Sequence, residues 1–426
     1  MNSSAENYVR TGPVFYPENL RYYARKLAFT RNQVFVDPVN STSSAPGQTV
    51  IFNVPPNSLV NPNMTMRFAS LSGNARTGMP RNVESVIERV QVIIGGRTVS
   101  DISQYGVLFN QVLNVRCGQD KALSRFVYQD SSRKFAHNAQ ATISQGHSIP
   151  DWLGILGSAE PVYLDTALTG AMQVRITFGG LETLGSGDAA AQVGDMTYSN
   201  LRAYFDVATM DDGQMYRSLT TARLLDGGAL EIPFKNYFTY QQSRGAASST
   251  MRGTVVTRSL DRLIFTQRAA FTSVIDDGSV LGSVPFNLFI QDSIDSGIYF
   301  EVDGKRYPHY TPENTFEQLA LTRSAWGTQY DYSTGDSLQA VYADATPIQG
   351  VPTAAAYENT NFQFTAALND DDSDRVASGY DTKGIASQIV CTYSGSGGTS
   401  GNNLYLFAEC SSLMVVRAGQ VIDVVS

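Results

Sequence analysis

Residues 90–99 read VQVIIGGRTV, and residues 298–307 read IYFEVDGKRY. In each stretch a strand pattern runs into a Gly-Gly or Asp-Gly pair, which favours a two-residue hairpin turn because both central residues of that turn need positive φ. A basic residue follows each turn, and a helical pattern follows each return strand. Gly96 and Gly304 lie 208 residues apart, almost half of the 426 residues. We therefore expect a tandem duplication of one β-domain, joined near residues 210–228.

Alternating apolar and polar residues predict more strands. Residues 172–178 read MQVRITF, and residues 201–207 read LRAYFDV. Such alternation is typical of strands with one face on a core and one face outward. It favours antiparallel pairing, because strands of parallel sheets are apolar on both faces. Further strands are predicted at residues 50–54, 64–68, 404–410, 413–416 and 421–425.

Helices are few in this prediction. Asp101–Val115 has apolar residues at helical spacing, with Asp101 or Ser100 as the N-cap. Pro312–Ser324 is the second candidate, with Thr311 as the N-cap and Pro312 at the first helical position. Three long stretches lack a strand pattern and are expected to be functional loops or contact surfaces. They span residues 116–160, 179–194 and 327–360.

The composition favours an all-β protein with much of its surface covered by neighbours. Charged residues make up 16% of the chain, below the roughly 25% of ordinary soluble domains. There are 25 Arg against 6 Lys, with 22 Tyr and 21 Phe, and protein interfaces enrich Arg and aromatics while depleting Lys. A coding bias explains the Arg excess equally well. The net charge of −8 argues against a general nucleic-acid binder.

The three cysteines, Cys117, Cys391 and Cys410, form neither a disulfide framework nor a zinc motif. No signal peptide or membrane span is visible, so we expect a protein made in a reducing compartment, with reduced core thiols. In a simple hairpin about the loop at residues 394–403, Cys391 and Cys410 would face each other.

The sequence predicts no catalysis, no cofactor and no metal site. Its three histidines are His137, His147 and His309, and no phosphate loop, nucleophile elbow or zinc-protease motif occurs. The acidic run at residues 370–374 has carboxylates at spacings found in a calcium loop. Arg375 stands where that loop needs Gly, so we expect a solvated loop tip.

Candidate contact residues lie in an N-terminal arm. Residues 1–31 are basic on an acidic protein and carry interleaved aromatics, with a short helix predicted at residues 17–29. Such an arm would touch nucleic acid, a membrane or a neighbouring subunit, or pack on its own domain. Two tryptophans in loop-like surroundings are candidate interface anchors, or are buried within their own domains. The candidates for inter-subunit contact are Arg21, Tyr22, Tyr23, Arg25, Trp152 and Trp326.

The order of these elements resembles a known family. The VxVxIGGRxV hairpin, VDGKRYP at residues 302–308 and FTAALNDDDSDRVASGYDTKG at residues 364–384 carry the resemblance, together with LFAECSSLMVVRAGQVIDVV at residues 406–425. The chain resembles the double jelly-roll major capsid proteins of icosahedral double-stranded DNA viruses, of the polinton-like virus and virophage type. The resemblance covers nearly the whole chain in architecture and little of it in residue identity.

The resemblance implies an all-β fold of two tandem eight-stranded jelly rolls with a few short helices in the insertions. Residues 1–31 would be an arm, residues 32–212 the first jelly roll and residues 213–426 the second. It implies a structural protein of the virion without enzymatic activity, forming homotrimers of pseudo-hexameric outline, the capsomers that tile an icosahedral capsid. The implied partners are neighbouring capsomers, penton and minor capsid proteins, and an internal membrane or the genome near the arm.

Two alternatives stay open. A secreted or tail-borne β-sandwich that binds or cleaves glycans would be a monomer or small oligomer with a paired-carboxylate site. A cupin-like metalloenzyme would carry metal when purified. The capsid interpretation predicts a metal-free trimer.

Overall fold

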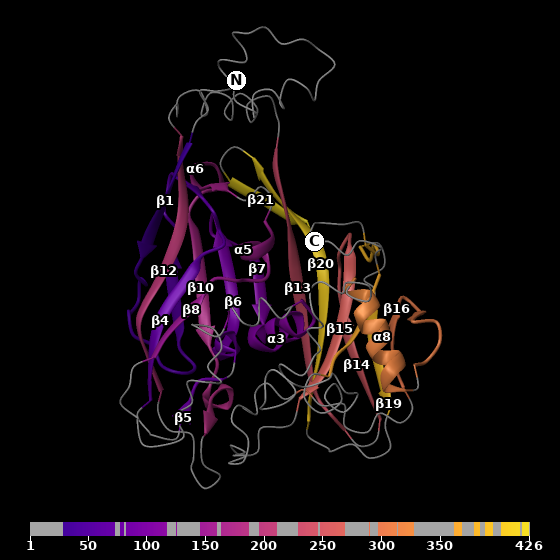
Figure 1. Cartoon of the computed structure of the whole chain (residues 1–426). Helices are drawn as coiled ribbons and strands as arrows, with labels where there is room; N and C mark the ends of the chain where they lie inside the picture. Colours follow the sequence, from indigo (N-terminus) through magenta and orange to yellow (C-terminus); the bar gives the residue numbers. More distant parts are fainter. Residues whose placement is uncertain are drawn as a thin grey trace, which may run out of the picture.

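A computed structural model shows two β-sandwiches side by side (Figure 1). Residues 17–28 of the predicted arm helix, the acidic run at residues 370–374 and residues 211–228 of the predicted join lie outside the described residues, while Phe29, the last residue of the predicted helix, lies in a strand. The structure describes residues 29–72, 77–80, 82–116, 125, 145–159, 163–186, 196–210, 229–245, 248–268, 289, 297–312, 314–327, 362–368, 379–383, 388–394, 402–417 and 420–425.

The first sandwich packs two antiparallel sheets face to face. One sheet has the order β1-β12-β4-β8, and the other has the order β2-β10-β6-β7. The strands are β1 (Phe29–Val36), β2 (Thr49–Asn53), β4 (Thr65–Ser72), β6 (Ile87–Ile94), β7 (Arg97–Ser103), β8 (Gln145–Ile149), β10 (Met172–Phe178) and β12 (Met196–Met210). Short strands β3 (Leu59–Val60), β5 (Thr77–Gly78), β9 (Leu164–Asp165) and β11 (Gly185–Ser186) extend these sheets or pair beside them.

The second sandwich has the sheets β13-β20-β15-β18 and β14-β19-β16-β17, also antiparallel. A ninth strand, β21 (Gln420–Val425), pairs with the end of β20. The other strands are β13 (Leu230–Ser243), β14 (Ser248–Thr254), β15 (Leu260–Arg268), β16 (Ile298–Val302), β17 (Lys305–Tyr307), β18 (Phe364–Ala367), β19 (Gln388–Ser394) and β20 (Asn403–Arg417).

The two sandwiches share one topology. When the eight main strands of each are numbered in chain order, the sheets read 1-8-3-6 and 2-7-4-5 in both. Eight strands in two Greek-key sheets make a jelly roll. The predicted fold of two tandem eight-stranded jelly rolls is confirmed.

The two predicted hairpins are present, and they occupy equivalent places. Gly95 and Gly96 have φ of 57° and 81° between β6 and β7, and Asp303 and Gly304 have φ of 52° and 72° between β16 and β17. A helix follows each hairpin, α3 (Tyr105–Arg116) after β7 and α8 (Thr315–Ala325) after β17. The sequence repeat therefore marks the same turn and the same helix in both jelly rolls.

The predicted starts of both helices were wrong. Asp101 lies in β7, where it accepts hydrogen bonds from Arg89 of β6, so the return strand continues past the predicted N-cap. The second helix begins at Thr315 rather than Pro312, because Asn314 Oδ1 accepts from the Glu317 amide at 2.9 Å and caps it.

Two strand predictions also need correction. Residues 404–410 and 413–416 belong to one 15-residue strand, β20, since Ser411 and Ser412 stay in register with β13. The stretch 116–160 contains strand β8. Its sequence QGHSI has no alternation of apolar and polar residues from which a strand could be predicted. The remaining described helices are short: η1 (Val83–Val86), α5 (Ile155–Ser158), α6 (Thr166–Thr169) and η2 (Leu181–Thr183). No helix among the described residues is long and apolar enough to cross a membrane.

Cys391 and Cys410 are buried and free, as predicted for core thiols. They do not face each other. Cys391 of β19 is opposite Met251 and Phe300, while Cys410 lies on β20 in the other sheet. Burial raises the pKa of both thiols well above the ordinary value.

The two jelly rolls differ in how far one sheet is covered. Strand β4, the counterpart of β15, alternates between buried residues and residues that are half-buried or exposed, and β12 likewise alternates between Arg202 and the buried Phe205. By contrast, every residue of β15 is buried. The sheet that contains β15 therefore has a core face and a second face that is also covered.

Candidate functional site

A catalytic centre finds no support in the described part of the chain. No group of three His, Cys, Asp or Glu side chains there is placed to hold a metal ion. His147 and Ser70 form a hydrogen bond of 2.7 Å, but both side chains are buried, so a substrate does not reach them. A cavity of about 140 Å³ lies between α3 and the second jelly roll, well below the roughly 300–1,000 Å³ of ordinary ligand sites.

The candidate functional feature is the junction between the jelly rolls. Edge strand β7 of the first lies beside edge strand β13 of the second. Ser100 Oγ donates to Asn236 Oδ1 at 3.1 Å, and Thr239 Oγ1 donates to the Ser103 carbonyl at 2.9 Å. An open strand edge is a template for unwanted pairing. The junction covers one edge of each jelly roll with side-chain hydrogen bonds.

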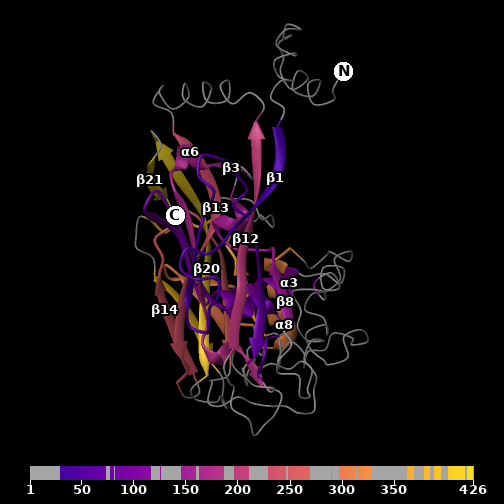
Figure 2. The same ribbon diagram turned by 90° about the vertical axis from the view of Figure 1, so that its left-hand side faces the viewer.

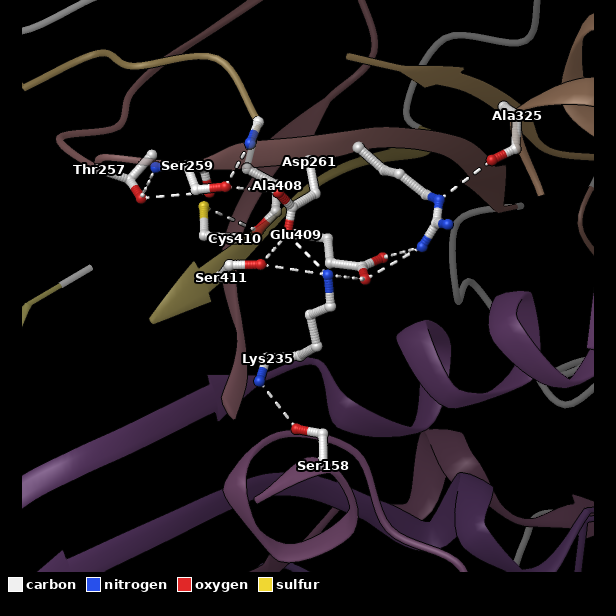
Figure 3. Close-up of polar contacts among 12 residues, drawn as sticks. Ser158, Lys235, Thr257, Ser259, Asp261, Ala325, Ala408, Glu409, Cys410 and Ser411 are labelled. Atoms are coloured by element: carbon white, nitrogen blue, oxygen red, sulfur yellow. Dashed lines mark hydrogen bonds and ion pairs between the residues drawn. The ribbon is translucent and has the colours of Figure 1, made fainter. Parts of the chain in front are cut away.

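Strand β13 at this junction also carries Lys235, which belongs to a buried ionic cluster (Figure 3). The ionic cluster consists of Lys235, Asp261, Arg262 and Glu409. Lys235 Nζ is 2.9 Å from Asp261 Oδ2 and 3.9 Å from Glu409 Oε1, and Arg262 Nη1 is 3.2 Å from the same Glu409 oxygen. The side chains come from three adjacent strands, β13, β20 and β15. Two cations and two carboxylates make the ionic cluster neutral.

Hydrogen bonds to neighbouring groups tie the ionic cluster to both jelly rolls. Ser411 Oγ donates to Asp261 Oδ2 at 2.6 Å, and Arg262 Nε donates to the Ala325 carbonyl at the end of α8 at 3.0 Å. The backbone amide of Lys235 donates to Ser158 Oγ of α5 in the first jelly roll at 2.8 Å. Buried charges are costly unless they are paired and hydrogen-bonded, and these bonds meet that condition.

Trp326 connects the ionic cluster to the first jelly roll. The guanidinium of Arg262 lies 5.0 Å from the centre of the indole ring, and that of Arg116 of α3 lies 4.9 Å from it. Burial lowers the pKa of Arg116, and the nearby Glu409 partly offsets this effect. Burial likewise raises the pKa of Tyr237 on β13 well above its ordinary value.

The predicted contact residues fall into two groups. Arg21, Tyr22, Tyr23 and Arg25 lie outside the described residues. Trp152 and Trp326 are described, and both are buried within the chain.

The described contacts of both tryptophans lie within the chain. Trp152 Nε1 donates to the Met64 carbonyl at 2.7 Å, and the ring packs against Tyr105. Trp326 Nε1 donates to Thr365 Oγ1 at 3.2 Å. Their burial matches the alternative left open from the sequence, with the addition that Trp326 also contacts the other jelly roll through Arg116.

Sequence reasoning missed the ionic cluster. Along β13, the apolar Ile232 and Phe234 alternate with Glu231, Pro233 and Lys235, and a charge at such a position is expected to face solvent. One signal was available: Glu409 is the lone charge in LYLFAECSSLMVV at residues 404–416. An isolated carboxylate in so apolar a strand needs a buried partner.

The outer face of the sheet β1-β12-β4 is exposed in the single chain, and we call it the open face. Phe35 is 55% exposed, and Arg202 lies over its ring at 5.0 Å. Arg67 lies over the ring of Tyr204 at 4.4 Å, and that ring packs beside Phe35. Aromatic and Arg side chains are enriched at protein interfaces, so the open face has the composition of a contact surface.

Comparison with solved structures places the fold. The PBCV-1 virus capsid, as a quasi-atomic model, is similar with a TM-score of 0.61 and 10% identity, covering 92% of this chain and 96% of that chain. A cryo-EM structure of the Sputnik virophage gives a TM-score of 0.53 at 10% identity, covering 91% and 86%. The Faustovirus major capsid protein gives 0.53 at 8% identity, covering 95% and 92%.

No protein-family model and no curated protein sequence matches the chain. At these identities the likeness is one of fold. The chain has the double jelly-roll fold of viral major capsid proteins.

Proposed function

We propose that this double jelly-roll chain is the major capsid protein of an icosahedral double-stranded DNA virus. The observation that carries the proposal is the duplicated topology, with sheets 1-8-3-6 and 2-7-4-5 in both halves. Cyclic symmetry repeats each surface of a subunit around the ring. Three copies therefore present six similar jelly rolls, a pseudo-hexameric capsomer that can tile a flat shell.

The role is structural, and the protein acts by assembly rather than by catalysis. Its absence of a metal-ligating group in the described residues and its small cavity are compatible with this role. The protein would reside in the virion after synthesis inside the host cell. Its main partners would be its own copies, penton proteins and minor capsid proteins.

The N-terminal arm would make the contacts at the base of the shell. Arg21, Tyr22, Tyr23 and Arg25 combine cationic and aromatic side chains in a basic segment. Such a segment suits neighbouring subunits, minor capsid proteins, an internal membrane or the genome. Deleting residues 1–28, which precede β1, is expected to leave the capsomer folded and to block closed-shell assembly.

Mass photometry and elemental analysis of the purified protein test the proposal. We expect a metal-free particle of about 140 kDa, three times the chain mass of 46.3 kDa. Negative-stain images are expected to show a six-sided outline. A stable monomer that binds or cleaves glycans would overturn the proposal in favour of the glycan-active sandwich, and a stoichiometric metal would favour a metalloenzyme.

A further inference from the structure

The junction inside one chain contains a helix of the first jelly roll packed on a sheet of the second. Residues Tyr105–Val115 of α3 are all buried, although α3 belongs to the first jelly roll alone. Gly106 of α3, Gln241 of β13 and Tyr405 of β20 line the cavity of about 140 Å³ described above. Arg116, at the end of α3, reaches Trp326. The first jelly roll thus covers the outer face of the sheet β13-β20-β15 with its helix.

Among the described residues, no helix covers the equivalent sheet of the first jelly roll. By topology, β1-β12-β4 corresponds to β13-β20-β15, and its outer face is the open face defined above. Phe35 is 55% exposed there, and the Arg202 side chain is 48% exposed. Figure 2 views the molecule from this side, with β1 and β12 across the front.

The equivalent helix of the second jelly roll has one exposed side. Helix α8 follows the Asp-Gly hairpin as α3 follows the Gly-Gly hairpin. One side of α8 packs on β18 through residues such as Thr322, while the opposite side carries Phe316, which is 71% exposed. Ala320 and Ser324 are exposed as well. We call this the free side of α8.

These surfaces lie at opposite ends of the molecule. Figure 1 shows the order sheet β1-β12-β4, helix α3, sheet β13-β20-β15, helix α8 from left to right. Within the described part of the chain, a helix of one jelly roll packs on a sheet of the other jelly roll once, and each end of the molecule holds one half of a second such contact. A single chain cannot bring its own ends together, whereas a second copy supplies the missing half.

We infer that the free side of α8 packs on the open face of a neighbouring copy, repeating between chains the contact that α3 makes within one chain. The inference rests on the proposed capsid function and names the surfaces that join its trimer. Phe316 of one copy would pack among Phe35, Tyr204 and the arginines that flank them. The contact is head-to-tail, because each copy offers a different surface to each neighbour, and such contacts close into rings.

Charge-introducing variants test the pairing. Phe316→Asp and Phe35→Asp each place a carboxylate in the expected contact, and both side chains are exposed in the single chain, so the monomer should stay folded. The matched control is Val256→Asp, since Val256 is 49% exposed and lies on neither surface. Mass photometry measures the oligomer, and circular dichroism measures the fold.

We expect Phe316→Asp and Phe35→Asp to weaken self-association roughly 100-fold or more, as for an interface hot spot. Val256→Asp should remain a trimer. If either Phe variant stays trimeric at wild-type concentrations, the inference fails while the capsid proposal stands. If the wild-type protein is itself a monomer, the capsid proposal fails. Loss of the trimer in all three variants also overturns the inference.

Mixing the two variants gives the sharper test. Phe316→Asp keeps an intact open face and Phe35→Asp keeps an intact α8, so the mixture can form one native contact. With different tags on the two variants, we expect a heterodimer of about 93 kDa, twice the chain mass of 46.3 kDa, in sedimentation at micromolar concentration. Each variant alone should sediment as a monomer. A mixture that shows only monomers refutes the pairing of these two surfaces, including the case in which either surface instead meets a membrane.

Discussion

Replacing Lys235 by Met is expected to destabilise the protein more than any surface charge change. The Lys235 ammonium is 2.9 Å from Asp261 Oδ2, and the side chains are 3% and 0% exposed. Without Lys235 the Asp261 carboxylate loses its nearest cation in a site that water does not reach. Removing one partner of a buried ion pair costs about 3–5 kcal/mol. We therefore expect a loss of that size in the free energy of unfolding.

Urea unfolding of the wild type and variants measures this loss, with tryptophan fluorescence as the signal because Trp326 lies beside the ionic cluster. Arg89→Met is the matched control. It breaks an ion pair of 2.6 Å whose side chains are 46% and 34% exposed, and exposed pairs contribute about 0–1 kcal/mol. The double variant Lys235→Met, Asp261→Asn should recover part of the loss, because the unpaired charge is gone. If Lys235→Met costs no more than Arg89→Met, the ionic cluster does not stabilise the junction.

Three further predictions follow from local features. Gly304→Ala should cost about 1 kcal/mol in thermal unfolding, because φ of 72° strains an L-residue although no atom lies within 4 Å of the added Cβ; an unchanged stability would contradict the turn assignment. In a Cys117→Ser background, Cys391 and Cys410 should resist a thiol reagent until urea is added, and labelling of the native protein would contradict their burial. Burial raises the pKa of Asp101, but hydrogen bonds from Arg89 and Gln91 and the charge of Arg89 outweigh this effect and hold the pKa below its ordinary value. Asp101→Asn should therefore be less stable than wild type at pH 7, and this difference in stability should be lost as the pH falls below about 4. A difference that persists at pH 2 would show that the charge of Asp101 is not its cause.

The sequence predicts the repeated hairpins and the half-buried strands well, because both depend on local chemistry. The Gly-Gly and Asp-Gly pairs specify their turns through φ alone, and MQVRITF at residues 172–178 matches β10 residue for residue. The helix starts were less predictable, since Thr311 and Asn314 are both able caps and only the backbone path chooses between them.

The junction could not be predicted in the same way, because it depends on contacts between distant segments. The alternation around Lys235 looks like a solvent-facing strand until the first jelly roll covers it. From the sequence, Trp152 and Trp326 are equally suited to an interface and to a core. Large aromatic side chains are favoured at both places, so their type does not tell the two apart. The strand β8 carries Gly146 and His147 in place of an apolar pattern, so its pairing with β4 is set by the fold.

The double coverage of the sheet β13-β20-β15 has a consequence for biosynthesis. Its outer face is completed by α3, which the ribosome releases before any of these strands. The first jelly roll can thus fold while translation continues and receive the later strands as they emerge. The C-terminal half produced alone would display Tyr405, Phe407 and the ionic cluster to solvent and would aggregate, whereas the N-terminal half alone would expose mainly α3. The first jelly roll is therefore synthesised first and can fold first, and the second jelly roll folds against it.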